Sequence, residues 1–175
     1  MHRTDAPLLP RTWTSPDGRA VVLRSIGPGD FEASRKFLTA LSYGTRYFRF
    51  GRGRFEYTDD ELRALCEPDR TRRGQVVAML DDGGTARMIG SARYVRDADD
   101  PALGEFAIVV ADDWRDRGLG RALMAALVDV AREAGLRRLR GRILGTNADM
   151  LGFVERAGFT LDAGDGPLRV ATLAL

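Results

Sequence analysis

Residues 115–121 read Arg-Asp-Arg-Gly-Leu-Gly-Arg, a composition that could hold an anion. Gly118 and Gly120 have no Cβ atom, so a ligand can come close to the main chain at both positions. An amphipathic helical pattern begins at Leu119, and the first amides of a helix have no hydrogen-bond partner inside it. These amides and the helix dipole favour negative charge, so the segment predicts a pyrophosphate site. The alternative interpretation is a turn that only starts a helix.

Two well-known phosphate-binding motifs do not match this segment. The P-loop requires Gly-Lys-Ser/Thr, whereas Arg121 and Ala122 follow Gly120. The dinucleotide fingerprint requires a third glycine where Leu123 stands, and it normally opens the first βα unit of a chain. The segment therefore predicts a pyrophosphate site of another kind.

The composition limits which chemistry this site could support. A chain of 175 residues suits one domain, and 27 basic against 25 acidic residues leave a net charge of +2, which argues against a nucleic-acid partner. Cys66 is the only cysteine, so the chain can form no internal disulfide, and a structural zinc or other metal site is not expected. The only histidine is His2, so a Ser-His-Asp or Cys-His catalytic system has no histidine in the body of the chain.

The sequence shows no segment expected to enter a membrane. No run approaches the roughly 18 apolar residues of a membrane span. The first ten residues contain no apolar core of signal-peptide length. We therefore expect a cytoplasmic protein with no membrane partner.

The hydrophobic pattern predicts which elements position the anion site. Apolar residues recur every three or four positions from Leu119 to Ala134, which predicts a long helix that Gly135 ends. A strand at 103–110 precedes the anion segment, and Asn147 can cap a short helix downstream. The remaining predicted elements are strands at 20–26, 75–80, 88–95, 139–143, 159–161 and 170–175, and helices at 31–41 and after Thr58.

These elements give the order β-α-α-β-β-β-α-β-α-β-β, a mixed α/β domain with a sheet of about seven strands. Residues 19–175 form the expected domain, and residues 1–18 an N-terminal extension. Residues 42–57 are rich in arginine and aromatic side chains without a clear period, so we expect an irregular or partly helical segment there.

In this setting the anion segment resembles the acetyl-CoA loop of the GCN5-related N-acetyltransferases (GNAT). That loop reads Arg/Gln-x-x-Gly-x-Gly/Ala between the fourth strand and the third helix, and Arg115, Gly118 and Gly120 match it. The resemblance implies the GNAT fold, with a mixed central sheet and flanking helices, and acetyl-CoA as co-substrate without a metal.

A second motif further along the chain also resembles this family. Asn147, Met150-Leu151 and Gly158-Phe159 are similar to its last motif. Together the two motifs and the order of elements extend the resemblance from about Arg19 to the C-terminus.

A narrower resemblance concerns the acetyltransferase domain of bacterial protein lysine acetyltransferases that act on AMP-forming acyl-CoA synthetases. The matching residues are Leu41-Ser42, 46–50, 89–95, 105–110 and 112–114. This resemblance implies transfer of an acetyl group from acetyl-CoA to a lysine side chain of a protein, with an acyl-CoA synthetase as the expected partner. Residues 46–54 would either contact that protein near the acceptor lysine or form a solvated helix and loop.

Acetyl transfer to lysine requires a base, because a free lysine has a pKa of about 10.4 and is almost fully protonated at pH 7. Glu105 resembles the catalytic glutamate of the family and would act as general base for direct attack. Phe106 and Ile108 are close in sequence, and apolar surroundings would raise the pKa of the carboxyl group. The other interpretation is a solvated glutamate at a strand end.

The resemblance also implies the cofactor contacts. Ile108, Val109 and Val110 would offer main-chain groups to the pantetheine arm, and one amide there would stabilise the oxyanion. Asn147 would contact the same arm. The residues expected around the pyrophosphate are Arg115, Asp116, Arg117, Gly118, Leu119, Gly120 and Arg121. Val154 stands where many relatives have a tyrosine as general acid, so the acid is unassigned.

Three other functions remain open at this point. The acceptor could be a small amine or a protein N-terminus, because fold and cofactor motif do not separate acceptors. The chain could be a non-catalytic acetyl-CoA sensor, which would not need Glu105. The chain could also bind nucleic acid through its arginines, but its nearly balanced net charge argues against this function.

Overall fold

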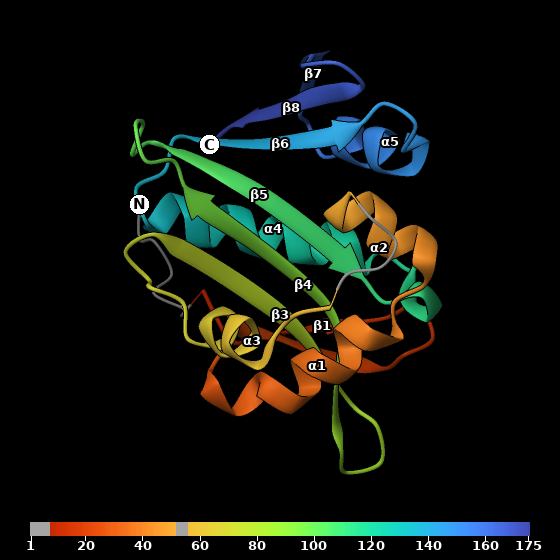
Figure 1. The fold of residues 1–175 in the computed structure, drawn as a ribbon. Coiled ribbons are helices and arrows are strands. Elements are labelled where there is room, and N and C mark those ends of the chain that lie inside the picture. The colour runs from red at the N-terminus through yellow and green to blue at the C-terminus, as the bar shows by residue number, and fades with distance from the viewer. Residues whose placement is uncertain (1–7, 52–55) are drawn as a thin grey trace, which may run out of the picture.

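The computed structural model describes residues 8–51 and 56–175, which form one mixed sheet with helices on both faces (Figure 1). The strands follow the order β1-β2-β3-β4-β5-β6-β8-β7. Their bounds are β1 (Arg11–Thr14), β2 (Ala20–Ser25), β3 (Arg73–Asp81), β4 (Ala86–Arg96), β5 (Leu103–Val110), β6 (Arg138–Leu144), β7 (Thr160–Ala163) and β8 (Leu168–Ala174). The predicted α/β class is confirmed, with eight strands rather than about seven.

The helices are α1 (Phe31–Ala40), α2 (Tyr43–Phe50), α3 (Asp59–Cys66), α4 (Leu119–Glu133) and α5 (Ala148–Arg156). Short 3-10 turns cover Pro28–Asp30 and Asp112–Trp114. The segment expected to be irregular or partly helical thus contains a helix, α2. Ser42 caps it by accepting a hydrogen bond from the Thr45 amide, and Gly51 ends it with φ 73°. His2 and residues 52–55 of the arginine-rich segment lie outside the described residues.

The strand β1 lies within the expected N-terminal extension, where no strand was predicted. It pairs with β2 in antiparallel register, from Arg11 opposite Leu23 to Thr14 opposite Ala20. Threonine and tryptophan favour strands, and the turn at Ser15 and Gly18 closes the hairpin. Residues 11–14 are therefore an edge strand of the sheet.

The sheet opens in its middle, between β5 and β6. These two strands are parallel and pair only from Leu103–Arg138 to Glu105–Arg140, whereas the other neighbouring strands are antiparallel. Beyond Glu105 the strands diverge, as Figure 1 shows. The rest of β5 keeps β4 as its only strand neighbour among the described residues.

The long helix α4 holds the sheet on one face and begins directly at the anion segment. It packs on β3, β4 and β5, and buries Leu119, Leu123 and Leu127 completely. Gly90 of β4 allows this close packing, since a Cβ there would lie 2.7 Å from Leu123 Cδ1. The core therefore fixes the start of α4 relative to β5.

A partly buried ion pair connects the start of α1 to β2. Both guanidinium nitrogens of Arg24 donate to the Asp30 carboxylate, at 2.8 and 2.7 Å, and the Gly27 amide donates to it at 2.8 Å. The hydrogen bonds from Arg24 lower the pKa of Asp30.

We expect Asp30→Asn to destabilise the fold by about 1–2 kcal/mol at pH 7, because it removes the charge from these hydrogen bonds. The pKa of Asp30 is lower in the folded chain, so its stabilisation is complete above the unfolded value of about 3.9 and is lost as the pH falls through the folded pKa. Thermal unfolding of both proteins at a series of pH values checks this. Asp60→Asn is the control, since Asp60 is 95% exposed in its pair with Arg63. An Asp30→Asn deficit that persists below the folded pKa would contradict the assignment.

None of the helices within residues 8–51 and 56–175 is long and apolar enough to cross a bilayer. These residues also contain no group of three or more His, Cys, Asp or Glu side chains arranged to hold a metal ion. The expected cytoplasmic location stays a prediction.

Candidate active site

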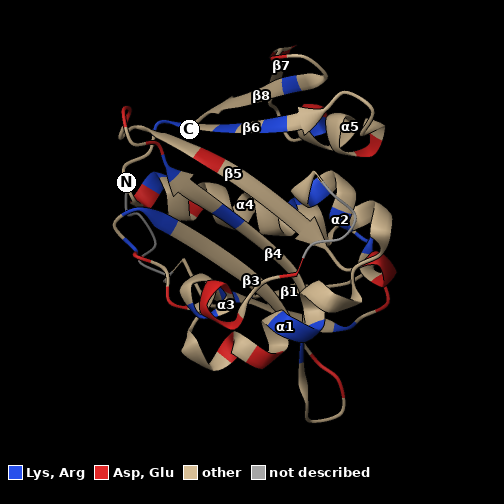
Figure 2. Cartoon of the chain, in the orientation of Figure 1, with Lys and Arg blue, Asp and Glu red and all other residues tan. Residues whose placement is uncertain are grey.

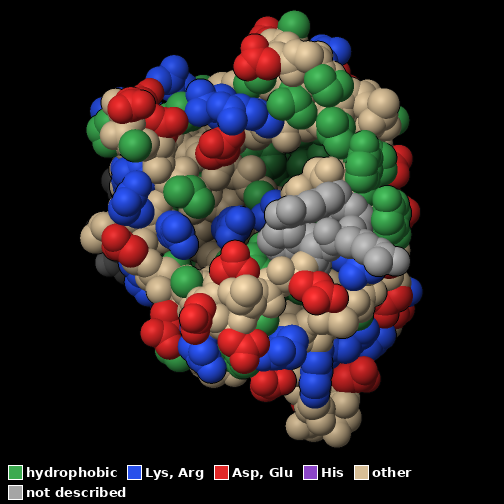
Figure 3. Space-filling view, in the orientation of Figure 1, with side chains coloured by type: hydrophobic (Ala, Val, Ile, Leu, Met, Phe, Trp, Pro, Cys, Tyr) green, Lys and Arg blue, Asp and Glu red, His purple; other side chains and the backbone are tan. Residues whose placement is uncertain are grey.

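A large cleft lies where β5 and β6 diverge. Its volume is about 1410 Å³, more than the roughly 300–1,000 Å³ usual for small-molecule sites. Residues of the β1 hairpin, α2, β4, β5, β6, the 115–121 segment and α5 line it. Figure 3 shows the hollow on this face of the molecule, with basic side chains beside it.

The structure brings the predicted site residues together in this cleft. The predicted residues that line it are Glu105, Ile108, Val109, Val110, Arg115, Asp116, Arg117, Gly118, Gly120, Arg121 and Asn147. Leu119 is the exception, because its side chain is fully buried in the core. Its main-chain amide still belongs to the first turn of α4. These placements do not test the roles that the resemblance assigns.

The 115–121 segment has the backbone shape that an anion site requires. Asp116 and Gly118 adopt left-handed conformations, with φ 57° and 89°. The first helical hydrogen bond runs from the Ala122 amide to the Gly118 carbonyl, at 3.2 Å. The amides of residues 119–121 therefore precede the helical hydrogen-bond ladder and are available to a ligand.

The open edge of β5 forms the floor of the cleft. Ile108, Val109 and Val110 pair with β4 on one side, at Ala92, Ser91 and Gly90 respectively. On the other side β6 has already diverged, so main-chain groups on that edge can pair with an extended ligand.

Glu105 lies at the point where the two strands separate, but its surroundings differ from the expectation. Its side chain is 40% exposed, and Arg142 Nε of β6 lies 3.6 Å from its carboxylate. Side chains alternate along a strand, so Phe106 and Ile108 point to the opposite face of β5. The apolar environment expected for Glu105 was therefore wrong, and an arginine faces it instead.

The downstream motif contributes one wall of the cleft through α5. Asn147 caps this helix, since its Oδ1 accepts a hydrogen bond from the Met150 amide at 3.2 Å, and it also lines the cleft. Val154 is fully buried. Among the described residues that line the cleft there is no tyrosine, so a tyrosine general acid has no candidate there.

A hydrogen-bond network connects α2 to the anion segment. The Asp112 carboxylate accepts hydrogen bonds from the Ser42 amide and hydroxyl, both at 2.9 Å, and from the Thr45 hydroxyl at 2.6 Å. Arg115 lies 3.6 Å from the same carboxylate and also donates to the Thr45 hydroxyl. Burial would raise the pKa of Asp112, but the hydrogen bonds from Thr45 and Ser42 outweigh it and lower the pKa.

Sequence reasoning missed several residues of the cleft. Trp13, Thr14 and Pro16 line it from the β1 hairpin. Arg117 reaches back to Asp17 at 3.1 Å, which ties this hairpin to the anion segment. The Thr and Trp residues before Pro16-Asp17-Gly18 were the available signal for a hairpin.

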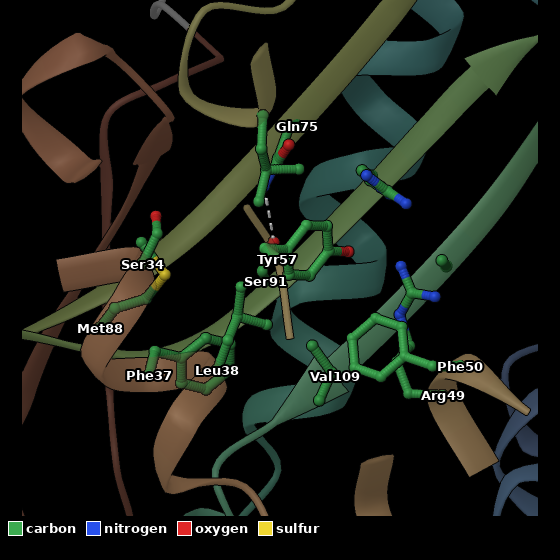
Figure 4. A pocket seen from close by; sticks show the side chains of 13 residues that line it. Ser34, Phe37, Leu38, Arg49, Phe50, Tyr57, Gln75, Met88, Ser91 and Val109 are labelled. Atoms are coloured by element: carbon green, nitrogen blue, oxygen red, sulfur yellow. Dashed lines mark hydrogen bonds between the residues drawn. The ribbon is translucent and has the colours of Figure 1, made fainter. Parts of the chain in front are cut away.

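A smaller inner pocket of about 30 Å³ lies under α1 and α2, with room for about one water molecule (Figure 4). Gln75 Nε2 donates to Ser91 Oγ at 3.0 Å in this pocket. Four residues, Arg49, Arg93, Ala107 and Val109, line both the inner pocket and the cleft. The inner pocket is therefore an extension of the cleft on the face that carries Glu105.

The sequence model of the acetyltransferase (GNAT) family matches residues 40–159, which include α2, β5, the anion segment and α5. The chain belongs to this family. Two curated relatives are acetyltransferases. "Acetyltransferase PA5475" of Pseudomonas aeruginosa is 35% identical over 123 residues, 70% of this chain and 66% of its own. "Acetyltransferase Pat" of Mycolicibacterium smegmatis is 33% identical over 141 residues, 81% of this chain and 41% of its own.

Solved structures support the GNAT assignment. The GNAT domain of PAT from S. lividans superimposes with a TM-score of 0.85 at 26% identity, covering 95% of this chain and 97% of that domain. The expected GNAT fold is therefore confirmed. The chain spans just under two thirds of the P. aeruginosa relative and less than half of Pat.

GNAT proteins use acetyl-CoA, and the residues present here fit that molecule. The amides of residues 119–121 suit a pyrophosphate, and the open edge of β5 suits an extended arm. At Gly120 a Cβ would fit in van der Waals contact with the Phe153 ring, 3.4 Å away, and its absence leaves that space beside the loop open.

Proposed function

We propose that this chain transfers the acetyl group of acetyl-CoA to a lysine side-chain amine of a protein, with Glu105 as general base. The observation that carries the proposal is the position of Glu105 at the separation of β5 and β6, beside the open edge of β5. The other two carboxylates that line the described cleft, Asp116 and Asp149, belong to the anion segment and to the first turn of α5.

In the proposed reaction, each part of the site has a separate task. The amides of residues 119–121 bind the pyrophosphate, and the open edge of β5 orients the acyl-bearing arm. Acetyl-CoA supplies the acetyl group as its thioester: the lysine nitrogen forms a bond to the acetyl carbon, the C–S bond breaks, and CoA leaves as a thiolate. Glu105 accepts the proton that the lysine ammonium must lose before the amine can attack. An amide of β5 donates to the developing oxyanion.

The surroundings of Glu105 support a protein as the acceptor. Arg49, Arg93 and Arg142 line the cleft there, and these positive charges oppose a small polycationic amine. Tyr43, Tyr47 and Phe48 of α2 are 64%, 41% and 42% exposed, and Phe48 lines the cleft. Exposed aromatic side chains beside a cleft are typical of protein contact surfaces.

The sequence resemblance to protein lysine acetyltransferases supports an AMP-forming acyl-CoA synthetase as the target, and the similarity to Pat and to the GNAT domain of S. lividans PAT supports the acetyltransferase activity itself. A competition among acceptors tests this. The enzyme and acetyl-CoA are incubated with one acceptor at a time, and initial rates of CoA release are compared. The acceptors are purified acetyl-CoA synthetase, an aminoglycoside, a polyamine and peptides with a free N-terminus. We expect the synthetase to give the highest kcat/KM. A small amine or an N-terminus that exceeds it would replace the proposed acceptor.

We expect Asp112→Ala to raise KM for the protein acceptor about 3- to 10-fold, because α2 loses three hydrogen bonds that hold it beside the cleft. Steady-state kinetics with each substrate varied in turn check this. Asp113→Ala is the control, since the neighbouring carboxylate pairs with Arg87 outside the cleft. An unchanged acceptor KM in Asp112→Ala would show that α2 does not contact the acceptor.

A further inference from the structure

Two arginines lie on the face of the sheet that carries Glu105. In the antiparallel register of β4 and β5, Val95 is opposite Glu105 and Arg93 is opposite Ala107. Side chains two residues apart share a face, so Arg93 and Glu105 point to the same side of the sheet. Arg49 comes from α2, and Figure 4 places it beside Phe50 and close to β5. Both arginines line the cleft and the inner pocket.

Among the described residues, these two positive charges have no carboxylate counterion. Within residues 8–51 and 56–175, neither Arg49 nor Arg93 forms a salt bridge with a carboxylate. Arg49 has the Phe50 ring at 4.9 Å as an aromatic partner. Burial and the like charge of Arg93 lower the pKa of Arg49 to about 10, so the two guanidinium groups repel each other.

Other arginines on β4 and β6 do have partners. Arg87 of β4 pairs with Asp113 at 3.0 Å, and Arg96 donates to main-chain carbonyl groups. Arg142 of β6 faces Glu105. Figure 2 shows the resulting pattern, an acidic segment on β5 between basic segments on β4 and β6. Among the described residues, the end of the cleft near Glu105 therefore holds the guanidinium groups of Arg49, Arg93 and Arg142 and the carboxylate of Glu105.

We propose that Arg49 and Arg93 form a subsite for a carboxylate that the acceptor carries close to its reacting amine. The proposal rests on the proposed acetyl transfer at Glu105, and it names the class of acceptor. Guanidinium groups present planar pairs of donors that match a carboxylate, and a bound carboxylate would relieve their mutual repulsion. It would also offset the cost of bringing a cationic lysine into a positively charged cleft. The carboxylate can belong to an acidic residue beside the acceptor lysine or to a free amino acid.

Matched acceptors test this subsite. Three peptides blocked at both ends contain one lysine and differ only in the preceding residue, which is Glu, Gln or Arg. Free lysine and lysine amide form the second pair, in which the α-carboxylate is the only difference. We expect the wild-type enzyme to prefer the carboxylate-bearing member of at least one set by about tenfold or more in kcat/KM. The preferred set identifies the source of the carboxylate.

The same acceptors, compared with variants of the enzyme, show whether Arg49 and Arg93 cause the preference for a carboxylate. Arg93→Gln is expected to reduce the preference to about twofold or less, and Arg93→Lys, which keeps the charge, to retain part of it. Arg49→Gln should act in the same direction. Arg87→Gln is the control on the same strand and should keep the full preference. Equal rates for all acceptors, or a preference unchanged in Arg93→Gln, would overturn the proposal.

A binding measurement separates failure of the subsite from failure of the proposed function. Calorimetry of the CoA-saturated wild-type protein should give about tenfold tighter binding of the carboxylate-bearing member of the preferred set, which is the Glu-Lys peptide over the Gln-Lys peptide or free lysine over lysine amide. Arg93→Gln should bind both equally. If neither peptide is acetylated but this difference in binding is present, the subsite stands and the acetyl transfer fails. If acetylation proceeds, and binding differs neither between the two peptides nor between free lysine and lysine amide, the subsite fails and the transfer stands.

Discussion

Replacing Glu105 by glutamine is expected to lower kcat/KM for acetyl transfer about 10²- to 10⁴-fold, the usual contribution of a general base. Glutamine keeps the size of the side chain but cannot accept the proton of the lysine ammonium. Acetyl-CoA affinity should stay unchanged, because the groups proposed to bind it lie at the start of α4 and along the edge of β5. Initial rates of CoA release and calorimetry with acetyl-CoA measure the two quantities.

The pH dependence distinguishes loss of a base from loss of structure. The deficit of Glu105→Gln should shrink as the pH approaches the lysine pKa of about 10.4, because more of the acceptor is then already neutral. Glu155→Gln on the exposed side of α5 is the control and should keep wild-type rates. A deficit of the same size at every pH, or full activity in Glu105→Gln, would remove Glu105 from the role of base.

The second large effect is expected at Gly118, where valine should weaken acetyl-CoA binding about 10- to 100-fold. Gly118 has φ 89°, a conformation that a β-branched residue adopts only at a cost of about 1–3 kcal/mol. The loop would relieve this strain by moving, and the amides of residues 119–121 would lose their alignment with the pyrophosphate.

The other end of α4 provides the control for this change. Gly135 has φ 80°, and a Cβ there would meet no atom within 4 Å. Gly135→Val should therefore destabilise the fold to a similar extent, as measured by chemical denaturation, while acetyl-CoA affinity stays at the wild-type value. Equal losses of affinity in both variants would mean that the anion segment does not bind the cofactor.

The parts predicted from the sequence were those that local patterns determine. The helix α4, the loop before it and its end at Gly135 depend on residues close together in the chain, and the structure has these elements as predicted. The short helix α2 was predicted only in part, because Tyr43, Tyr47 and Phe48 are exposed and its aromatic residues therefore do not mark one buried face. Its position depends on Asp112, which is distant in the sequence, so local patterns could not predict it.

The surroundings of the proposed base could not be predicted for a similar reason. Arg142 comes from β6, and Arg93 comes from the register of β4 against β5. Sequence neighbours such as Phe106 indicated an apolar setting, but they lie on the other face of the strand. The cleft lies where β5 and β6 diverge, and this divergence depends on pairing between residues distant in the sequence. Local patterns therefore could not predict it.

Mass spectrometry of an AMP-forming acetyl-CoA synthetase, incubated with acetyl-CoA and this protein, tests the central claim most directly. The account predicts one added acetyl group on a defined lysine side chain with the wild-type protein, and almost none with Glu105→Gln in the same time. An unmodified synthetase, in a sample where acetyl-CoA binding to the wild-type protein has been verified by calorimetry, would contradict it.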